Sequence, residues 1–248
     1  MENYNQDRIY QLPADGSALG TVTKNFMANV FLWMFAALAI SALCAYLFAS
    51  NTQLLNLLID TTTGKMNLFG WVVMLAPLGF VMLMSFGFQR LSAPAITALF
   101  ILYAAITGIS FSFILLAYTP GTVFTCFLSA AAMFGVMAVM GYTTKKDLTG
   151  FGKIMMMGLI GIIIASIINF FAHSGTMDYI ISFIGVMVFT GLTAYDVQKL
   201  KRIGAGIEFE GTAVADTRKL AIMGALSLYL DFINIFLFLL RLFGGRRD

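Results

Sequence analysis

The last long apolar segment, Leu220 to Phe243, constrains the fold most. It is long enough to cross a bilayer, yet it contains Asp231 near its middle. A charged residue at the centre of a membrane helix costs roughly 2.5–3.5 kcal/mol on insertion scales. Such residues usually face a protein interior or a water-filled cavity, and they mark ion or proton pathways. We therefore expect Asp231 to be a functional residue that faces other helices.

Helical spacing predicts a polar stripe that includes this aspartate. Gly224, Ser227, Asp231 and Asn234 fall at positions i, i+3, i+7 and i+10, so they lie on one side of a helix. The remaining sides are formed by Leu, Phe and Ile. The pattern predicts a central helix whose stripe contacts other helices, with Ser227 and Asn234 as candidates to line a pathway.

The composition is typical of a polytopic membrane protein. Of 248 residues, 60% are hydrophobic and 11% charged, and the mean hydropathy is +0.89. Soluble domains are about one quarter charged, so this chain has too few polar residues to cover a water-exposed globule. The net charge of +3, without a basic stretch rich in aromatics, gives no reason to expect a nucleic-acid partner.

Seven apolar runs, each close to the roughly 20 residues that a membrane helix needs, predict an all-α fold with seven transmembrane helices. The predicted spans are Phe26–Ser50, Leu68–Phe88, Ile96–Tyr118, Thr122–Tyr142, Lys153–Ala172, Tyr179–Asp196 and Leu220–Phe243. Residues 1–25 form a polar tail, 26–244 the membrane domain and 245–248 a short basic tail. The short connection at Thr119–Gly121 predicts that the third and fourth helices are antiparallel neighbours.

The distribution of Lys and Arg predicts that the amino terminus is inside. In that orientation the inner segments hold Arg8, Lys24, Arg90, Lys145, Lys146, Lys153, Lys199, Lys201, Arg202, Arg218 and Lys219. The outer loops hold only Lys65, but seven full spans leave Arg241, Arg246 and Arg247 outside, against the rule. A re-entrant last segment, with Asp231 near its tip, would return these arginines to the inside. The length of the segment favours a full crossing.

Three further charged residues are candidates to act with Asp231. Asp196 ends the sixth run and Arg90 the second, both at the inner face, whereas Asp147 in the KKDL loop is expected to be solvated beside its lysines. Two nearby carboxylates in a poorly solvated place do not ionise independently. At low pH the two carboxyl groups would share a proton. As the pH rises and the proton leaves, the two carboxylates would repel each other or bind a cation. Asp196 and Asp231 could thus form a pH-dependent latch, with Arg90 stabilising the ionised state. Two alternatives remain open: Asp196 pairs with a nearby lysine, and Arg90 is a simple membrane anchor.

At these residues the chain resembles the Bax inhibitor-1 family. The segment ALSLYLDFINIFLFLLRLFG, residues 225–244, is similar to the last-helix signature of that family. AYDVQKLK, residues 194–201, is similar to the end of its sixth helix, and KKDL, residues 145–148, to a loop motif. The resemblance covers the chain from about residue 25 onward, and the short tails resemble the bacterial branch, which implies a bacterial cytoplasmic (inner) membrane.

The resemblance implies seven helices with the last surrounded by the other six. It also implies a pH-sensitive calcium leak in which Asp196 and Asp231 are the pH sensor and transient calcium ligands, with Arg90 as latch. Calcium is then the transported ion, and no cofactor is expected. One departure is that the segment from Trp71 to Gln89 contains no Asp or Glu, so the arginine–glutamate contact of some bacterial relatives has no counterpart here.

Two other classes of function stay open. Intramembrane aspartyl proteases also place aspartates on their sixth and seventh helices, and Tyr195–Asp196 resembles their first motif. Asp231, however, is preceded by LYL instead of GxG, and no PAL motif follows, so we assign no catalytic residue and expect no enzyme. The third class is a non-conducting membrane regulator that binds a protease or a cell-death factor; the sequence identifies no protein partner.

Overall fold

The computed structural model describes residues 16–60, 65–210 and 214–244, which form eight α-helices and one small β-hairpin. In order these are α1 (Gly16–Ser50), α2 (Thr52–Leu55), β1 (Ile59–Asp60), β2 (Lys65–Met66), α3 (Leu68–Gly87), α4 (Ala93–Ala117), α5 (Pro120–Thr143), α6 (Thr149–Ala172), α7 (Gly175–Glu210) and α8 (Val214–Phe243). The strands pair antiparallel. Residues 1–15 and 245–248 of the predicted tails, with Arg8, Arg246 and Arg247, lie outside the described residues.

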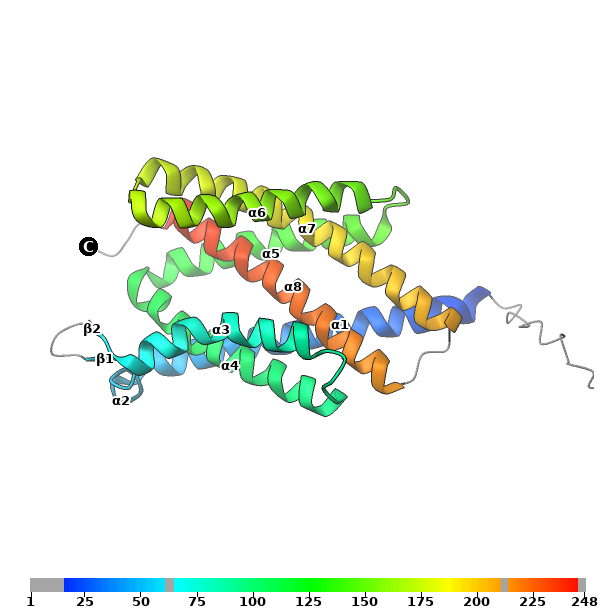
Figure 1. Ribbon diagram of the computed structural model, residues 1–248, viewed down its shortest axis with the longest axis horizontal. Helices are drawn as coiled ribbons and strands as arrows, with labels where there is room; N and C mark the ends of the chain where they lie inside the picture. Colours follow the sequence, from blue (N-terminus) through cyan, green and yellow to red (C-terminus); the bar gives the residue numbers. More distant parts are fainter. Residues whose placement is uncertain (1–15, 61–64, 211–213, 245–248) are drawn as a thin grey trace, which may run out of the picture.

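The long helices form an elongated bundle that α8 crosses obliquely through the middle (Figure 1). Seven of them, all except α2, are long and apolar enough to cross a membrane. The predicted all-α, seven-helix membrane fold is therefore confirmed.

Three helices, α1, α7 and α8, extend by six residues or more beyond the apolar spans predicted from the sequence. Helix α1 begins at Gly16, so residues 16–25 of the predicted tail are helical, and α8 begins at Val214. Helix α7 continues to Glu210, so Asp196 lies 14 residues before its end, roughly 21 Å at 1.5 Å per residue. Hydropathy marks only the apolar part of a helix, whereas the backbone hydrogen bonds continue through polar turns. Asp196 therefore lies well inside α7 and not at its end.

Helix α8 is the centre of the bundle. In its most apolar stretch 72% of the residues are buried, against 6% in α6. It packs on α1, α4, α5 and α7, while α3 packs on α4 and α6 packs on α7 in an outer position. Because α8 is one continuous helix of 30 residues, it is not a re-entrant hairpin. Its last turn lies at the opposite end of the bundle from the first turn of α1 (Figure 1).

The turn between α4 and α5 is tight, as its sequence predicts. Thr119 caps α5 by accepting a hydrogen bond from the Thr122 amide at 3.3 Å, and Pro120 occupies the first turn of the helix. The two helices then diverge: α5 packs on α7 and α8, whereas α4 packs on α1, α3 and α8. The two helices run in opposite directions, as predicted, but they do not pack on each other as the neighbours that the short turn suggests (Figure 1).

Small residues allow the helices to approach closely. A Cβ atom at Gly108 of α4 would collide with the backbone of Ser41 in α1, and one at Gly141 of α5 would collide with the backbone of Ala194 in α7. Lipid tails are as apolar as Leu, so association of membrane helices depends on such close packing and on hydrogen bonds between helices.

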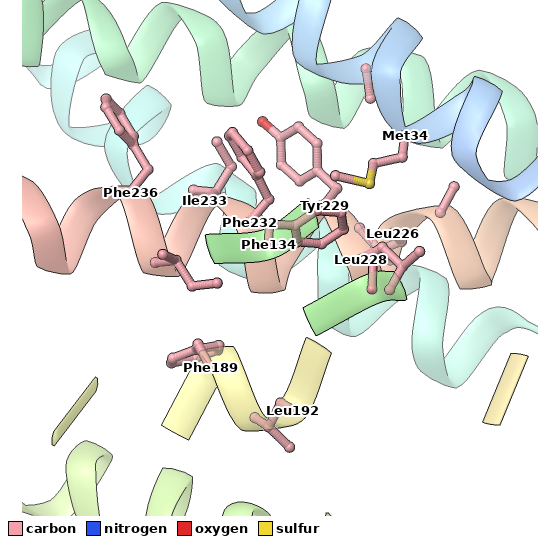
Figure 2. Close-up of a cluster of buried hydrophobic side chains, with 14 of the residues drawn as sticks. Met34, Phe134, Phe189, Leu192, Leu226, Leu228, Tyr229, Phe232, Ile233 and Phe236 are labelled. Atoms are coloured by element: carbon pink, nitrogen blue, oxygen red, sulfur yellow. The ribbon is translucent and has the colours of Figure 1, made fainter. Parts of the chain in front are cut away.

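Aromatic side chains fill the remaining core around α8 (Figure 2). Phe232 packs edge-on against Phe134 of α5, with ring centroids 5.7 Å apart, and against Phe127 at 5.2 Å. Such edge-to-face pairs add about 0.5–1.5 kcal/mol beyond the area that they bury. This core fixes which face of α8 is turned toward α7.

Candidate functional site

Asp231 is buried in the middle of the bundle. Its side chain is 4% exposed, and its Oδ2 atom has no hydrogen-bond partner among the described residues. Buried polar groups are nearly always hydrogen-bonded, and a lone buried charge is costly. The structure thus places Asp231 where the sequence predicts it, inside the protein and without a neutralising cation close by among the described ion pairs.

Asp196 lies on α7, half-buried, and faces the same region. The two carboxylates are close enough for the charge of Asp196 to act on Asp231. Lys199, less than one turn further along α7, is the cation whose charge acts on Asp196. The two predicted aspartates therefore lie on neighbouring helices, α7 and α8, within range of each other's charge and with a lysine on the side of Asp196 only. Their pairing as a pH sensor remains a prediction.

Arg90 lies in the turn that follows α3 and is exposed. Among the described residues, no ion pair or hydrogen bond joins it to Asp196 or Asp231. Helix α3 packs on α4, on the other side of the bundle from α7. A latch formed by Arg90 thus remains a prediction.

The polar stripe of α8 faces α7 at several levels. At Gly224 an added Cβ would collide with Leu200 of α7, and two turns further along Asp231 lies within range of the charge of Asp196. Ser227 and Asn234 are half-buried, and the Asn234 Nδ2 donates to the Leu230 carbonyl at 2.8 Å within its own helix. Their role in lining a pathway remains a prediction.

A polar hollow of about 590 Å³ opens at the far end of this interface. It is lined by Tyr118, Ser166, Asn169, Phe170, Asp178, Ile181, Arg241 and Gly244. Arg241, on the same face of α8 as Asn234, approaches Asp178 of α7 at 3.8 Å. This ion pair could not be predicted from the sequence, because Asp178 lies more than 60 residues before Arg241.

An aromatic side chain lies between this hollow and the aspartates. The Phe238 ring packs directly against Gly185 of α7. A Cβ atom at position 185 would collide with this ring. Phe238 also contacts Phe189 at 5.9 Å between ring centroids, and the Arg241 guanidinium lies 5.7 Å above it. This apolar contact closes the α7–α8 interface between Asp231 and the hollow.

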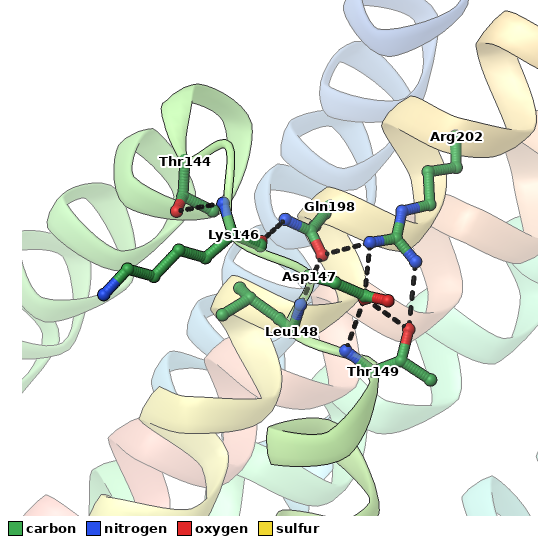
Figure 3. A network of polar contacts seen from close by, with 7 residues as sticks. All are labelled: Thr144, Lys146, Asp147, Leu148, Thr149, Gln198 and Arg202. Atoms are coloured by element: carbon green, nitrogen blue, oxygen red, sulfur yellow. Dashed lines mark hydrogen bonds and ion pairs between the residues drawn. The ribbon is translucent and has the colours of Figure 1, made fainter.

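On the side toward the end of α7, a network of hydrogen bonds joins α7 to the loop between α5 and α6 (Figure 3). The buried Gln198 side chain donates from Nε2 to the Lys146 carbonyl at 2.8 Å and accepts at Oε1 from the Leu148 amide at 2.8 Å. Arg202, one turn further, donates to Gln198 at 2.8 Å and pairs with Asp147 at 2.6 Å. Gln198 lies two residues from Asp196, so this network fixes the part of α7 that carries the aspartate.

The network corrects the expectation that Asp147 is merely solvated beside its lysines. Its carboxylate accepts from the Thr149 hydroxyl at 2.6 Å and the Thr149 amide at 2.8 Å, which satisfies the start of α6. The hydrogen bond from the Thr149 hydroxyl, followed by those from Arg202 and the Thr149 amide, holds the pKa of Asp147 well below its usual value. Spacing predicts one part of this: Gln198 and Arg202 are four residues apart, on one face of α7.

A second buried polar cluster holds α8 against α1 and α4. The Ser41 hydroxyl donates to the Ala104 carbonyl at 2.7 Å, so the Tyr229 hydroxyl, 2.8 Å from Ser41, is the donor in the second bond. Tyr103 packs edge-on against the Tyr229 ring at 5.5 Å. The sequence analysis missed this cluster because Ser41 and Tyr229 are 188 residues apart.

Comparison of the sequence with known proteins identifies the family of this chain. The model of the family described as inhibitor of apoptosis-promoting Bax1 matches residues 23–248. The inner membrane protein YbhL of Escherichia coli K12 is 45% identical over 224 residues, 90% of this chain and 93% of YbhL. An uncharacterised protein of Deinococcus radiodurans is 42% identical over 91% of this chain and 92% of its own length. An uncharacterised membrane protein of Streptococcus pyogenes is 39% identical over 91% and 94%. The chain is therefore an integral membrane protein that belongs to the Bax inhibitor-1 family.

Proposed function

We propose that this protein is a pH-sensitive calcium leak pathway, controlled by the protonation of Asp196 and Asp231. The observation that carries the proposal is the buried Asp231 carboxylate, which lacks a hydrogen-bond partner at one oxygen and faces a second carboxylate. A purely structural aspartate would be expected to have its oxygens satisfied.

The pair supplies a physical reason for pH dependence. One proton shared between Asp196 and Asp231 joins α7 to α8, whereas two ionised carboxylates repel each other or bind a cation between them. Calcium prefers six to eight oxygen ligands. Within the described residues no three His, Cys, Asp or Glu side chains gather, so two carboxylates favour transient passage over a resident ion.

The surroundings of the pair fit a pathway along the α7–α8 interface. The stripe of α8 runs from Gly224 past Asp231 toward the polar hollow beside Arg241, and Phe238 closes the interface before it. The present arrangement then corresponds to a closed state. Opening requires that Phe238 leave its place against Gly185.

We place the amino terminus on the inner side of a bacterial cytoplasmic membrane. The end of the bundle with the first turn of α1 holds most described lysines and arginines, as the positive-inside rule expects. The E. coli relative is an inner membrane protein by name. Seven spans then place Arg241 on the outer side, where the negative charge of Asp178 compensates its positive charge.

A flux assay tests the proposal directly. The purified protein is placed in liposomes loaded with a calcium indicator, and calcium entry is followed between about pH 5 and pH 8. We expect entry that depends on pH in the wild type and loses that dependence in Asp231→Asn. Asp216→Asn, an equal change of charge at the exposed start of α8, is the matched control. Calcium entry that stays pH-dependent in Asp231→Asn, or that changes equally in Asp231→Asn and the control, would refute the mechanism. The absence of any flux would favour a non-conducting regulator.

A further inference from the structure

A groove of about 310 Å³ lies between α1 and α5 at the basic end of the bundle. Both helices rest on α7, which leaves a furrow between them. Lys24, Met27, Phe31, Ala138, Val139 and Tyr142 line it. The groove belongs neither to the aspartate pair nor to the polar hollow at the other end of α8.

One lysine lines the groove, and the ammonium group of a second contacts Tyr142, another lining residue. Lys24 is exposed and lines the groove directly. Lys201 reaches across from α7: its Nζ donates to the Tyr142 carbonyl at 2.8 Å and lies 4.8 Å from the centre of the Tyr142 ring. Within residues 16–60, 65–210 and 214–244, neither ammonium forms an ion pair with a carboxylate. The groove therefore has an uncompensated positive end.

The depth of the lining residues matches the layers of a membrane. Lys24 lies four residues after the start of the apolar span of α1, and Tyr142 lies in the last turn of α5, so both are at the level of lipid headgroups. Met27 and Phe31 extend inward over roughly 10 Å at 1.5 Å per residue. Val139, on the facing wall, is 63% exposed and thus open to the hydrocarbon.

We propose that this groove is a binding site for an anionic phospholipid. The phosphate lies between Lys24 and Lys201, and one acyl chain lies along Phe31 and Val139. Basic pockets between transmembrane helices bind anionic lipid headgroups. Two cations favour a net negative headgroup over a zwitterionic one, because none of the lining residues is a carboxylate that could pair with a choline or ethanolamine ammonium.

The test is lipid binding to the full-length protein in detergent, measured by native mass spectrometry. The probes are short-chain phosphatidylglycerol, phosphatidylcholine with the same chains, and glycerol phosphate without chains. We expect phosphatidylglycerol to bind best, and Lys24→Gln to weaken it about fivefold. Lys153→Gln is the matched control, because this exposed lysine lies at the same end of the bundle but does not line the groove.

A second variant tests the apolar part of the site. Val139→Trp adds an indole to an exposed wall of the groove, and we expect it to abolish binding while the protein still elutes as a folded species. Equal binding of both phospholipids, or equal effects of Lys24→Gln and Lys153→Gln, would overturn the proposal. Glycerol phosphate that binds as tightly as phosphatidylglycerol would identify a free-phosphate site instead. A changed oligomeric state in Val139→Trp with unchanged lipid binding would identify a contact between copies of the chain.

Discussion

Gln198 is the residue whose replacement tests the loop network most sharply. Its buried side chain, 6% exposed, makes hydrogen bonds to the Lys146 carbonyl, the Leu148 amide and Arg202. Leu148 is the N-cap residue of α6 and has no side-chain cap of its own, so Gln198 supplies the partner of its amide. Gln198→Leu keeps a similar volume but removes all three bonds.

The expected loss follows from these contacts. Each hydrogen bond contributes about 0.5–1.5 kcal/mol net, and a buried backbone group left unpaired costs about 1–3 kcal/mol. Water reaches part of this loop and replaces some of the lost partners. We therefore expect Gln198→Leu to lower the free energy of unfolding by about 2–4 kcal/mol.

Two measurements separate global from local effects. Reversible unfolding in mixed micelles, followed by circular dichroism, gives the free energy of unfolding. Trypsin cleavage after the exposed Lys145 and Lys146 reports release of the loop. Gln89→Leu is the control: Gln89 is exposed in another turn, and surface changes usually stay within about 0.5 kcal/mol. If Gln198→Leu matches Gln89→Leu in both measurements, the network does not hold the loop.

Three further predictions concern the helix contacts and the loop carboxylate. Tyr229→Phe should cost about 0.5–1.5 kcal/mol of unfolding free energy in the same micelle titration, because one buried hydrogen bond to Ser41 is lost; no change would mean that the bond is not formed. Gly108→Leu should sharply reduce the yield of monodisperse protein in size-exclusion chromatography, since its side chain meets the Ser41 backbone; a normal yield would contradict the close packing. The lowered pKa of Asp147 means that its stabilising contribution is present above its unfolded pKa of about 3.9 and is lost only as the pH falls through the lower folded value. Asp147→Asn should therefore destabilise the protein equally at about pH 5 and pH 8, and a loss that differs between them would show that Asp147 titrates in this range.

Much of the architecture could be predicted from the sequence, because membrane spans are a one-dimensional signal. Apolar length reveals each span, and a carboxylate at Asp231 is conspicuous in such a segment. Helix ends were less predictable: α7 continues through polar turns to Glu210, so Asp196 lies deeper along its helix than hydropathy suggests.

Contacts between distant segments could not be predicted, because helix spacing describes one helix at a time. Nothing in the loop at Asp147 indicates that Arg202, 55 residues later, pairs with it. The short turn at Thr119 determines the direction of α5 but not the helices on which it packs. Those neighbours depend on where small residues such as Gly141 allow two helices to approach closely. The position of Arg90 relative to the aspartates likewise depends on tertiary packing.

The most direct test of the central claim is a double-mutant cycle on calcium flux as a function of pH. Proteoliposomes containing the wild type, Asp196→Asn, Asp231→Asn and the double variant are compared at the same protein density. If the two carboxylates act as one unit, each single variant removes the pH dependence and the double variant adds nothing further. A pH dependence that persists in the double variant, or two independent effects that add, would contradict the account.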